Sequence, residues 1–259
     1  MKILFIGDVV GSPGRRGLAA AMPELRERHA PAFVVVNGEN SAGGLGITEK
    51  TAKEIFAAGA DAITTGNHVY RHREAYGYLD TEPRIVRPAN YPHANPGRGH
   101  TVIEKDGRRI AVVNLSGAVQ LRVARSPFHE ADAILERLEG DADVVLVDFH
   151  AEVTSEKVAM GWHLDGRVAA VFGTHTHVPT ADGRVLPGGT AYITDVGMTG
   201  SRAGVIGVKR DQALESFITL MPVRFETAED DVWVMGAAVE VGNAGLAESL
   251  EPVLLPAPG

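Results

Sequence analysis

The sequence contains no cysteine. A chain without thiols can form neither a disulfide framework nor a thiolate zinc site, and it has no cysteine nucleophile. Aromatic residues are also few, at 6% of the 259 positions, but 44% of the residues are hydrophobic, which excludes a disordered chain. Because a chain of this length can bury about three quarters of its unfolded surface, we expect a single domain over residues 1–259.

Long hydrophobic runs and an excess of positive charge are missing as well. No apolar run approaches the roughly 20 residues of a membrane-spanning helix, so we expect no membrane contact. Met1 leads directly into a strand-like segment without the features of a secretion signal, which favours a cytoplasmic location. The formal net charge is −8, so broad attraction to nucleic acid phosphates is not expected. An anionic ligand must therefore be captured locally.

The first 80 residues alternate short apolar runs with amphipathic stretches. Near-continuous apolar strands of this kind are buried on both faces, as in a sheet covered by helices. The pattern predicts strands at 2–6, 33–36 and 62–65, with helices after Pro13, Thr48 and Arg71.

The remainder of the chain is richer in predicted strands. Asp106-Gly107 is a two-residue hairpin signal, and Ser126-Pro127 is typical of a helix N-terminus. The hairpin joins strands 100–105 and 109–115, the helix runs to about Leu138, and a second helix is expected around 153–160. Further strands are predicted at 144–148, 169–172, 190–194, 219–225 and 232–241, followed by a loosely ordered tail at 252–259.

Five of the apolar strands end in residue types that can bind a metal ion. In α/β sheets, ligands are held at the carboxyl ends of strands, where side chains can converge. The candidates at these ends are Asp8, Glu39 with Asn40, Asn67 with His68, His150, and His175 with His177.

Each of these signals is weak when taken alone. Asp8 before a glycine-rich turn can be a helix cap, and Glu39-Asn40 can be a polar turn. The joint arrangement is harder to obtain from turn chemistry, which would also favour Ser, Thr and Gly at these positions. A dinucleotide-binding loop starting at Gly7 is excluded, because Val9 and Ser12 stand where that motif requires glycine.

The motifs GDVVG, GEN, GNH, DFHAE and GTHTH, in this order, resemble those of the calcineurin-like metallophosphoesterases. Together with their flanking residues they are similar to the YmdB-like branch over nearly the whole chain. The sequence departs from the broader superfamily at Val10, where that superfamily has histidine, and at Glu39, where it has aspartate. The resemblance implies an α/β fold, a four-layer αββα sandwich with mixed sheets.

The resemblance also implies two divalent metal ions. Asp8, Asn40 and His177 would hold one ion, Asn67, His150 and His175 the other, and the Glu39 carboxylate would bridge them. Imidazole, carboxylate and amide oxygen donors favour iron or manganese, with zinc as an alternative. Two adjacent ions can hold phosphoryl oxygens and activate a water molecule.

The GNH histidine and a nearby basic loop complete the expected site. His68 resembles the family's catalytic histidine, which would stabilise the transition state or protonate the leaving alkoxide; a supporting role beside the ligands is the alternative. Arg71 and Arg73 are candidates for substrate phosphate contacts, although most such clusters are solvated surface.

The expected function is that of a dinuclear metal-dependent phosphodiesterase. Its substrates would be small phosphodiesters such as 2′,3′-cyclic nucleotides, with RNA ends as a further candidate. Two alternatives stay open: a phosphomonoesterase or nucleotidase, and a regulatory protein that binds metal and a nucleotide with little turnover. The sequence leaves the oligomeric state open, a homo-oligomer included.

Overall fold

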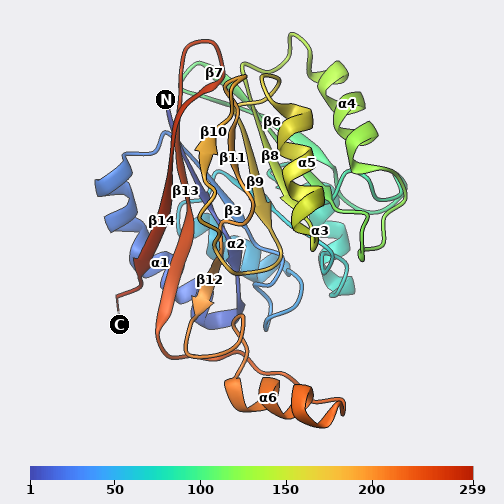
Figure 1. The fold of residues 1–259 in the computed structure, drawn as a ribbon, viewed down its shortest axis with the longest axis vertical. Coiled ribbons are helices and arrows are strands. Elements are labelled where there is room, and N and C mark those ends of the chain that lie inside the picture. Colours follow the sequence, from blue (N-terminus) through green and yellow to red (C-terminus); the bar gives the residue numbers. More distant parts are fainter. Residues whose placement is uncertain (259) are drawn as a thin grey trace.

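The first strands of the chain are buried on both faces, with one face packed on helices and the other on a second sheet. In β1 (Lys2–Ile6), Ile3 and Phe5 pack toward a second sheet, whereas Leu4 and Ile6 pack against helices. This alternation follows from the two-residue side-chain period of a strand. The computed structural model describes residues 1–258, and in it two sheets lie face to face between helical layers (Figure 1).

The first sheet has the strand order β2-β12-β13-β1-β3-β4-β5, with β14 paired to β13. Strands β1, β3, β4 and β5 are parallel, whereas β13 runs antiparallel to β1. Besides β1, this sheet comprises β2 (Asp8–Val9), β3 (Phe33–Asn37), β4 (Ala62–Thr64), β5 (Ile85–Val86), β12 (Met198–Ser201), β13 (Val232–Val241) and β14 (Ala247–Pro256).

The second sheet has the order β10-β11-β9-β8-β7-β6. Strands β7, β8, β9 and β11 are parallel, and β6 forms the predicted hairpin with β7. The strands are β6 (His100–Lys105), β7 (Arg108–Ser116), β8 (Val144–His150), β9 (Ala170–Thr174), β10 (Arg184–Val185) and β11 (Ala191–Ile193).

Four of the helices cover the outer faces of the two sheets. Apolar side chains of α1 and α2 pack on the first sheet, and those of α4 and α5 pack on the second. The helices are α1 (Gly11–His29), α2 (Glu49–Ala57), the 3-10 turn η1 (Arg73–Ala75), α3 (Tyr76–Thr81), α4 (Pro127–Leu138), α5 (Thr154–Leu164) and α6 (Arg210–Thr219).

Between the sheets lies one continuous apolar layer. At its centre the rings of Phe5 and Phe172 are stacked, with centroids 4.4 Å apart. The resulting order of helix, sheet, sheet and helix confirms the predicted α/β four-layer sandwich with mixed sheets.

Two predicted segments differ from the structure. Residues 219–225 form no strand, because α6 ends at Thr219 and the chain then continues without a strand partner past Pro222, which lacks a backbone N–H. The predicted loose tail at 252–259 is wrong over residues 252–256, which complete β14 and pair with β13; residue 259 lies outside the described residues. Prolines at 252 and 256 are tolerated there, because β14 is an edge strand.

Among the described residues, no helix combines the length and the apolar character needed to cross a bilayer. The cytoplasmic location stays a prediction.

A candidate metal centre at the carboxyl edges of both sheets

Parallel strands bring distant parts of the sequence to one edge of the molecule. β1, β3 and β4 end at the same edge of the first sheet, and β8 and β9 end at the corresponding edge of the second. Because the two sheets face each other, residues that follow these strand ends can converge across the interface. All of the metal-ligating candidates predicted from the sequence follow or end one of these five strands.

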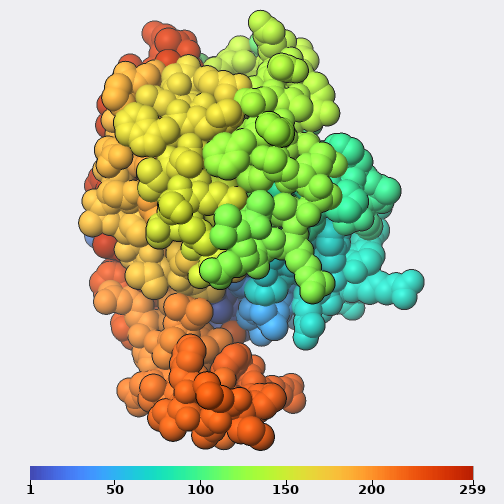
Figure 2. Space-filling model, turned by 45° about the vertical axis from the view of Figure 1, so that its right-hand side comes forward, coloured from blue at the N-terminus to red at the C-terminus, as the bar shows by residue number. Residues whose placement is uncertain are grey.

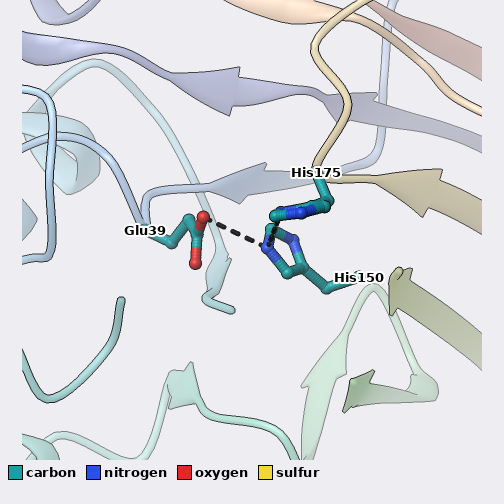
Figure 3. A group of neighbouring side chains, drawn as sticks. All are labelled: Glu39, His150 and His175. Atoms are coloured by element: carbon teal, nitrogen blue, oxygen red, sulfur yellow. Dashed lines mark hydrogen bonds and ion pairs between the residues drawn. The ribbon is translucent and has the colours of Figure 1, made fainter. Parts of the chain in front are cut away.

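His150, at the end of β8, is the centre of the first group of donors. Its Nε2 atom lies 3.1 Å from Glu39 Oε1, 3.0 Å from Asn67 Oδ1 and 3.0 Å from His175 Nδ1. Figure 3 shows Glu39, His150 and His175 directed toward one another from separate segments, and one donor atom of each lies within 4.8 Å of the others. Such a cluster of one carboxylate and two imidazoles can hold a divalent metal ion.

A second group of donors surrounds Asp8. Its Oδ1 atom lies 3.6 Å from His177 Nε2 and 4.0 Å from His150 Nδ1. Asn40 Nδ2 lies 3.1 Å from His177 Nε2 and donates to Glu39 Oε1 at 3.1 Å. Glu39 Oε1 therefore contacts both groups, through His150 in the first and Asn40 in the second. Its role as the bridging metal ligand stays a prediction.

The donor set fits a bound cation. Asp8 Oδ1 is buried and has no hydrogen-bond partner within the described chain, which is costly for a carboxylate oxygen. The side chains of Asp8, Glu39 and His150 are fully buried, so two carboxylates lie in a region that solvent does not reach. A divalent cation would compensate both the unpartnered oxygen and the buried negative charge.

The charges within the cluster depend strongly on one another. Burial would raise the pKa of Glu39, but the charge and hydrogen bond of His150 hold that pKa well below its usual value. Burial also disfavours protonated His150, but the neighbouring Glu39 charge raises the pKa of His150 to about 9. For His175, burial and the charge of His150 lower the pKa to about 4. Protons and metal ions compete for these nitrogen lone pairs, so metal affinity depends on pH.

The orientation of His150 is set by two residues that the sequence analysis missed. His150 Nδ1 lies 2.9 Å from Thr174 Oγ1, and that hydroxyl donates to Asp148 Oδ1 at 2.7 Å. Since the hydroxyl proton is directed at Asp148, the Thr174 oxygen accepts from Nδ1–H, and Nε2 is the nitrogen that faces the cluster. Burial raises the pKa of Asp148 to about 7.

A buried ion pair supports the loop between His175 and His177. The Thr176 backbone N–H and hydroxyl donate to Asp195 Oδ2 at 3.1 and 2.6 Å, and Lys157 Nζ donates to the same oxygen at 2.8 Å. Lys157 and Asp195 are almost fully buried. Asp148 could have been found as a polar residue inside the apolar strand VVLVDF, but no sequence signal points to Lys157 and Asp195.

His177 is oriented by the backbone. Its Nδ1–H donates to the Ile206 carbonyl at 2.9 Å, which leaves Nε2 directed toward Asp8. His175 and His177 both have a positive backbone φ, at 96° and 65°, a conformation that residues other than glycine rarely adopt. Backbone strain of this kind is concentrated at functional sites, where surrounding contacts enforce it.

Gly66 is required because the chain just after β4 passes close to the cluster. A Cβ atom at this position would lie 2.2 Å from Glu39 Oε2 and 2.4 Å from His150 Nε2. Any larger residue would therefore displace the donors themselves.

The residues predicted to act in catalysis or substrate binding, His68, Arg71 and Arg73, lie outside the donor cluster. His68 Nδ1 lies 2.9 Å from Asn40 Oδ1 and 3.3 Å from Glu39 Oε1, and one third of its side chain is exposed. Both neighbours are acceptors, so Nδ1 carries the proton and Nε2 is the other ring nitrogen available to a ligand. Arg71 lies exposed on the following loop and Arg73 lies exposed at the start of η1, and the structure gives neither a contact with the cluster.

Comparison with known proteins identifies the family. The family model described as "YmdB-like protein" matches residues 4–253. The chain belongs to the YmdB-like family. It is 47% identical over 243 residues to a 2′,3′-cyclic-nucleotide 2′-phosphodiesterase of Bacillus subtilis (strain 168), a match that covers 94% of this chain and 92% of the relative. The family resemblance predicted from the motifs is thereby confirmed.

Solved structures agree with this assignment. A phosphatase from Mycoplasma pneumoniae has a TM-score of 0.93 and 34% identity, covering 99% of this chain and 94% of that chain. A putative 5′-nucleotidase from Staphylococcus aureus has a TM-score of 0.61 and 16% identity, covering 99% of this chain and 54% of that chain. At 16% identity, the Staphylococcus aureus structure is similar to this chain in fold alone.

Proposed function

We propose that this protein is a dinuclear metal-dependent phosphodiesterase that hydrolyses small phosphodiesters, 2′,3′-cyclic nucleotides among them. The observation that carries the proposal is the convergence of donors from five strand ends on one buried cluster in which Asp8 Oδ1 has no hydrogen-bond partner in the described chain. The name of the Bacillus subtilis relative supports the choice of a cyclic nucleotide as substrate.

Seven side chains would hold the ions. Asp8, Asn40 and His177 form one set, Asn67, His150 and His175 form the other, and Glu39 lies between them. Iron or manganese suits these oxygen and imidazole donors best, with zinc as the alternative. When bound, the ions would supply Lewis-acid polarisation of the phosphoryl oxygens and a water molecule of lowered pKa.

His68 is the residue we propose as the catalytic group beside the metal ligands. Its Nδ1–H is directed at Asn40 Oδ1 and Glu39 Oε1, so the ring is held next to the donors while its exposed edge can reach a substrate. When both ring nitrogens are protonated, Nε2–H can donate its proton to the leaving alkoxide, which leaves the neutral ring with its proton on Nδ1, or it can donate a hydrogen bond to the phosphoryl group. Arg71 and Arg73 would contact the substrate from the adjacent exposed loop.

A substrate panel tests the proposed reaction. Manganese-loaded wild-type protein should hydrolyse 2′,3′-cyclic AMP faster than para-nitrophenyl phosphate, and Glu39→Gln should lose both activity and bound metal. Preference for the monoester would favour a nucleotidase. Stoichiometric binding of 2′,3′-cyclic AMP without product would instead indicate a regulatory protein and contradict the proposed enzyme.

The role of His68 can be separated from metal binding. His68→Ala should keep its metal content and lose turnover of 2′,3′-cyclic AMP by roughly 10²–10⁴-fold, the usual contribution of a general acid. The loss should be much smaller with bis(para-nitrophenyl) phosphate, because its leaving group needs no protonation. Equal losses on both substrates would indicate phosphoryl stabilisation rather than proton donation, and unchanged turnover would remove His68 from the mechanism.

A further inference from the structure

Asp195 lies at the carboxyl end of a further parallel strand, but it is not one of the seven proposed ligands. It follows β11, which pairs in parallel with β9, the strand that ends just before His175. Its side chain is fully buried, as are those of Asp8 and Glu39. A carboxylate is buried at a high cost unless neighbouring groups compensate its charge and satisfy its oxygens.

The neighbours of Asp195 hold it in one position. Its backbone N–H donates to Thr180 Oγ1 at 2.9 Å, and its carbonyl accepts from the Thr180 N–H at 3.0 Å. On the side chain, Oδ1 accepts from the Gly197 N–H at 2.8 Å. Because the backbone and one carboxylate oxygen are fixed, the position of the other oxygen, Oδ2, is fixed as well.

The Oδ2 atom of Asp195 holds the turn between His175 and His177. Thr176 donates to this oxygen through both its backbone N–H, at 3.1 Å, and its hydroxyl, at 2.6 Å. The two histidines on either side of Thr176 have positive φ, a conformation that surrounding contacts must enforce. Two hydrogen bonds from Thr176 to one fixed oxygen are contacts of this kind.

Lys157 compensates the charge of Asp195. Figure 2 shows α5, coloured yellow, at the surface of the molecule, but the Lys157 side chain on this helix is only 1% exposed and therefore reaches inward. Its Nζ atom donates to Asp195 Oδ2 at 2.8 Å and lies 3.5 Å from Thr176 Oγ1. Buried ion pairs are often no more stabilising than apolar side chains of the same volume, so stability alone does not account for this pair.

We propose that Asp195, neutralised by Lys157, is a positioning residue that sets both ion sites at once. His175 belongs to the proposed site of one ion and His177 to that of the other, so a shift of the turn between them displaces a ligand of each ion. Thr174 differs, because it orients His150 and so acts on one site. This inference rests on the proposed dinuclear function and extends it to residues outside the ligand set.

Manganese titration of two Thr176 variants tests this role while the buried pair stays intact. Thr176→Val removes the hydroxyl donor, so both ions should bind about 10–100-fold more weakly than in the wild type, the usual effect of removing a group that orients metal ligands. Thr176→Ser keeps the hydroxyl and should bind both ions with affinities close to those of the wild type. Weakening of one ion alone in Thr176→Val, or wild-type affinity for both, would overturn the proposal.

A second set of variants separates positioning from stability. Asp195→Asn leaves Lys157 buried without its counter-ion, so this variant should melt earlier than the wild type and bind both ions about 10–100-fold more weakly. The double variant Lys157→Met, Asp195→Asn removes both charges. Its melting temperature in chelator should recover, while its affinity for both ions should stay low. Recovery of the affinity together with the melting temperature would mean that the pair acts through stability alone, contrary to the proposal.

Asp61→Asn is the matched control at the opposite edge of the first sheet. Asp61 precedes β4 and, like Asp195, accepts from a lysine and from a backbone N–H: Lys105 Nζ at 2.6 Å and the Val34 N–H at 2.8 Å. This variant should lose stability and keep wild-type affinity for both ions. Two ions bound equally well by the wild type and by every Thr176 and Asp195 variant would contradict this inference alone, whereas a wild type that binds no manganese would contradict the proposed function as well.

Discussion

Thr174 connects the metal-facing histidine to a buried polar side chain of each sheet. Its hydroxyl accepts from His150 Nδ1–H and donates to Asp148, which in turn accepts from Asn37 Nδ2 at 2.9 Å. Partners of this kind fix the ring of a ligating histidine and raise metal affinity. Thr174 is therefore a positioning residue, although it touches neither a metal ion nor a substrate.

Thr174→Val should weaken metal binding while the chain still folds. Valine has nearly the same shape but removes the hydroxyl, which leaves His150 Nδ1–H and Asp148 without their shared partner. We expect a loss of about 10–100-fold in manganese affinity, measured by titration, and an altered nitrogen NMR signature of His150. Thr174→Ser keeps the hydroxyl and should stay close to wild type. An affinity of Thr174→Val equal to that of wild type would contradict this role.

Gly66→Ala should damage the metal centre directly. The added Cβ would collide with Glu39 Oε2 and His150 Nε2, at 2.2 and 2.4 Å, so we expect loss of bound metal and of activity. Gly77→Ala is the matched control, because a Cβ there meets nothing within 4 Å and alanine stabilises a helix by about 0.5–1 kcal/mol. Elemental analysis measures the metal bound by each variant. A Gly66→Ala protein that binds as much metal as wild type would contradict the expected collision with Glu39 and His150.

At the scale of the elements, β14 is an edge strand with one face buried against the core. Along its second half, Val253 and Leu255 are buried and Leu254 is exposed, which is the alternation of an edge strand with one covered face. Leu255 pairs across from Val234 in β13. The two prolines in this segment suggest a loose tail in the sequence alone, because their placement on an edge depends on the tertiary fold.

Leu255→Ala and Leu254→Ala should differ strongly in stability. Leu255 is 4% exposed, and its truncation should lower the free energy of unfolding by about 2–5 kcal/mol. Leu254 is 53% exposed, so its truncation should change that free energy by less than about 1 kcal/mol. Urea denaturation of both variants provides the measurement, and similar midpoints for the two would show that β14 does not pack as described.

Elements with local signals could be predicted from the sequence, and those that depend on distant partners could not. The hairpin at Asp106-Gly107 and the helix after Thr48 both form, the latter with a capping box between Thr48 and Thr51. Residues 219–225 contain enough apolar residues for a strand, but no neighbouring strand is available to pair with them. The convergence of the metal-ligand candidates could be predicted because each ends or follows one of five strands. Thr174, Asp195 and Lys157 act through contacts that only folding creates.

At the scale of the whole molecule, metal binding should stabilise the fold, because the donors come from both sheets. A ligand at 100 times its dissociation constant adds about 2.7 kcal/mol, which corresponds to a rise in Tm on the order of 5–10 °C. Chelated wild-type protein should therefore melt earlier and recover when manganese is added. Glu39→Gln should show no such recovery in a thermal melt, and an equal rise in both proteins would place the stabilising ion elsewhere.

We propose that seven side chains from five strand ends enclose two divalent ions, and anomalous diffraction from crystals of the wild-type protein grown with manganese tests this proposal. We predict two peaks inside the cluster, one beside Asp8, Asn40 and His177, the other beside Asn67, His150 and His175, with Glu39 contacting both. A cluster without peaks at saturating manganese, or ions bound only by other residues, would contradict the account.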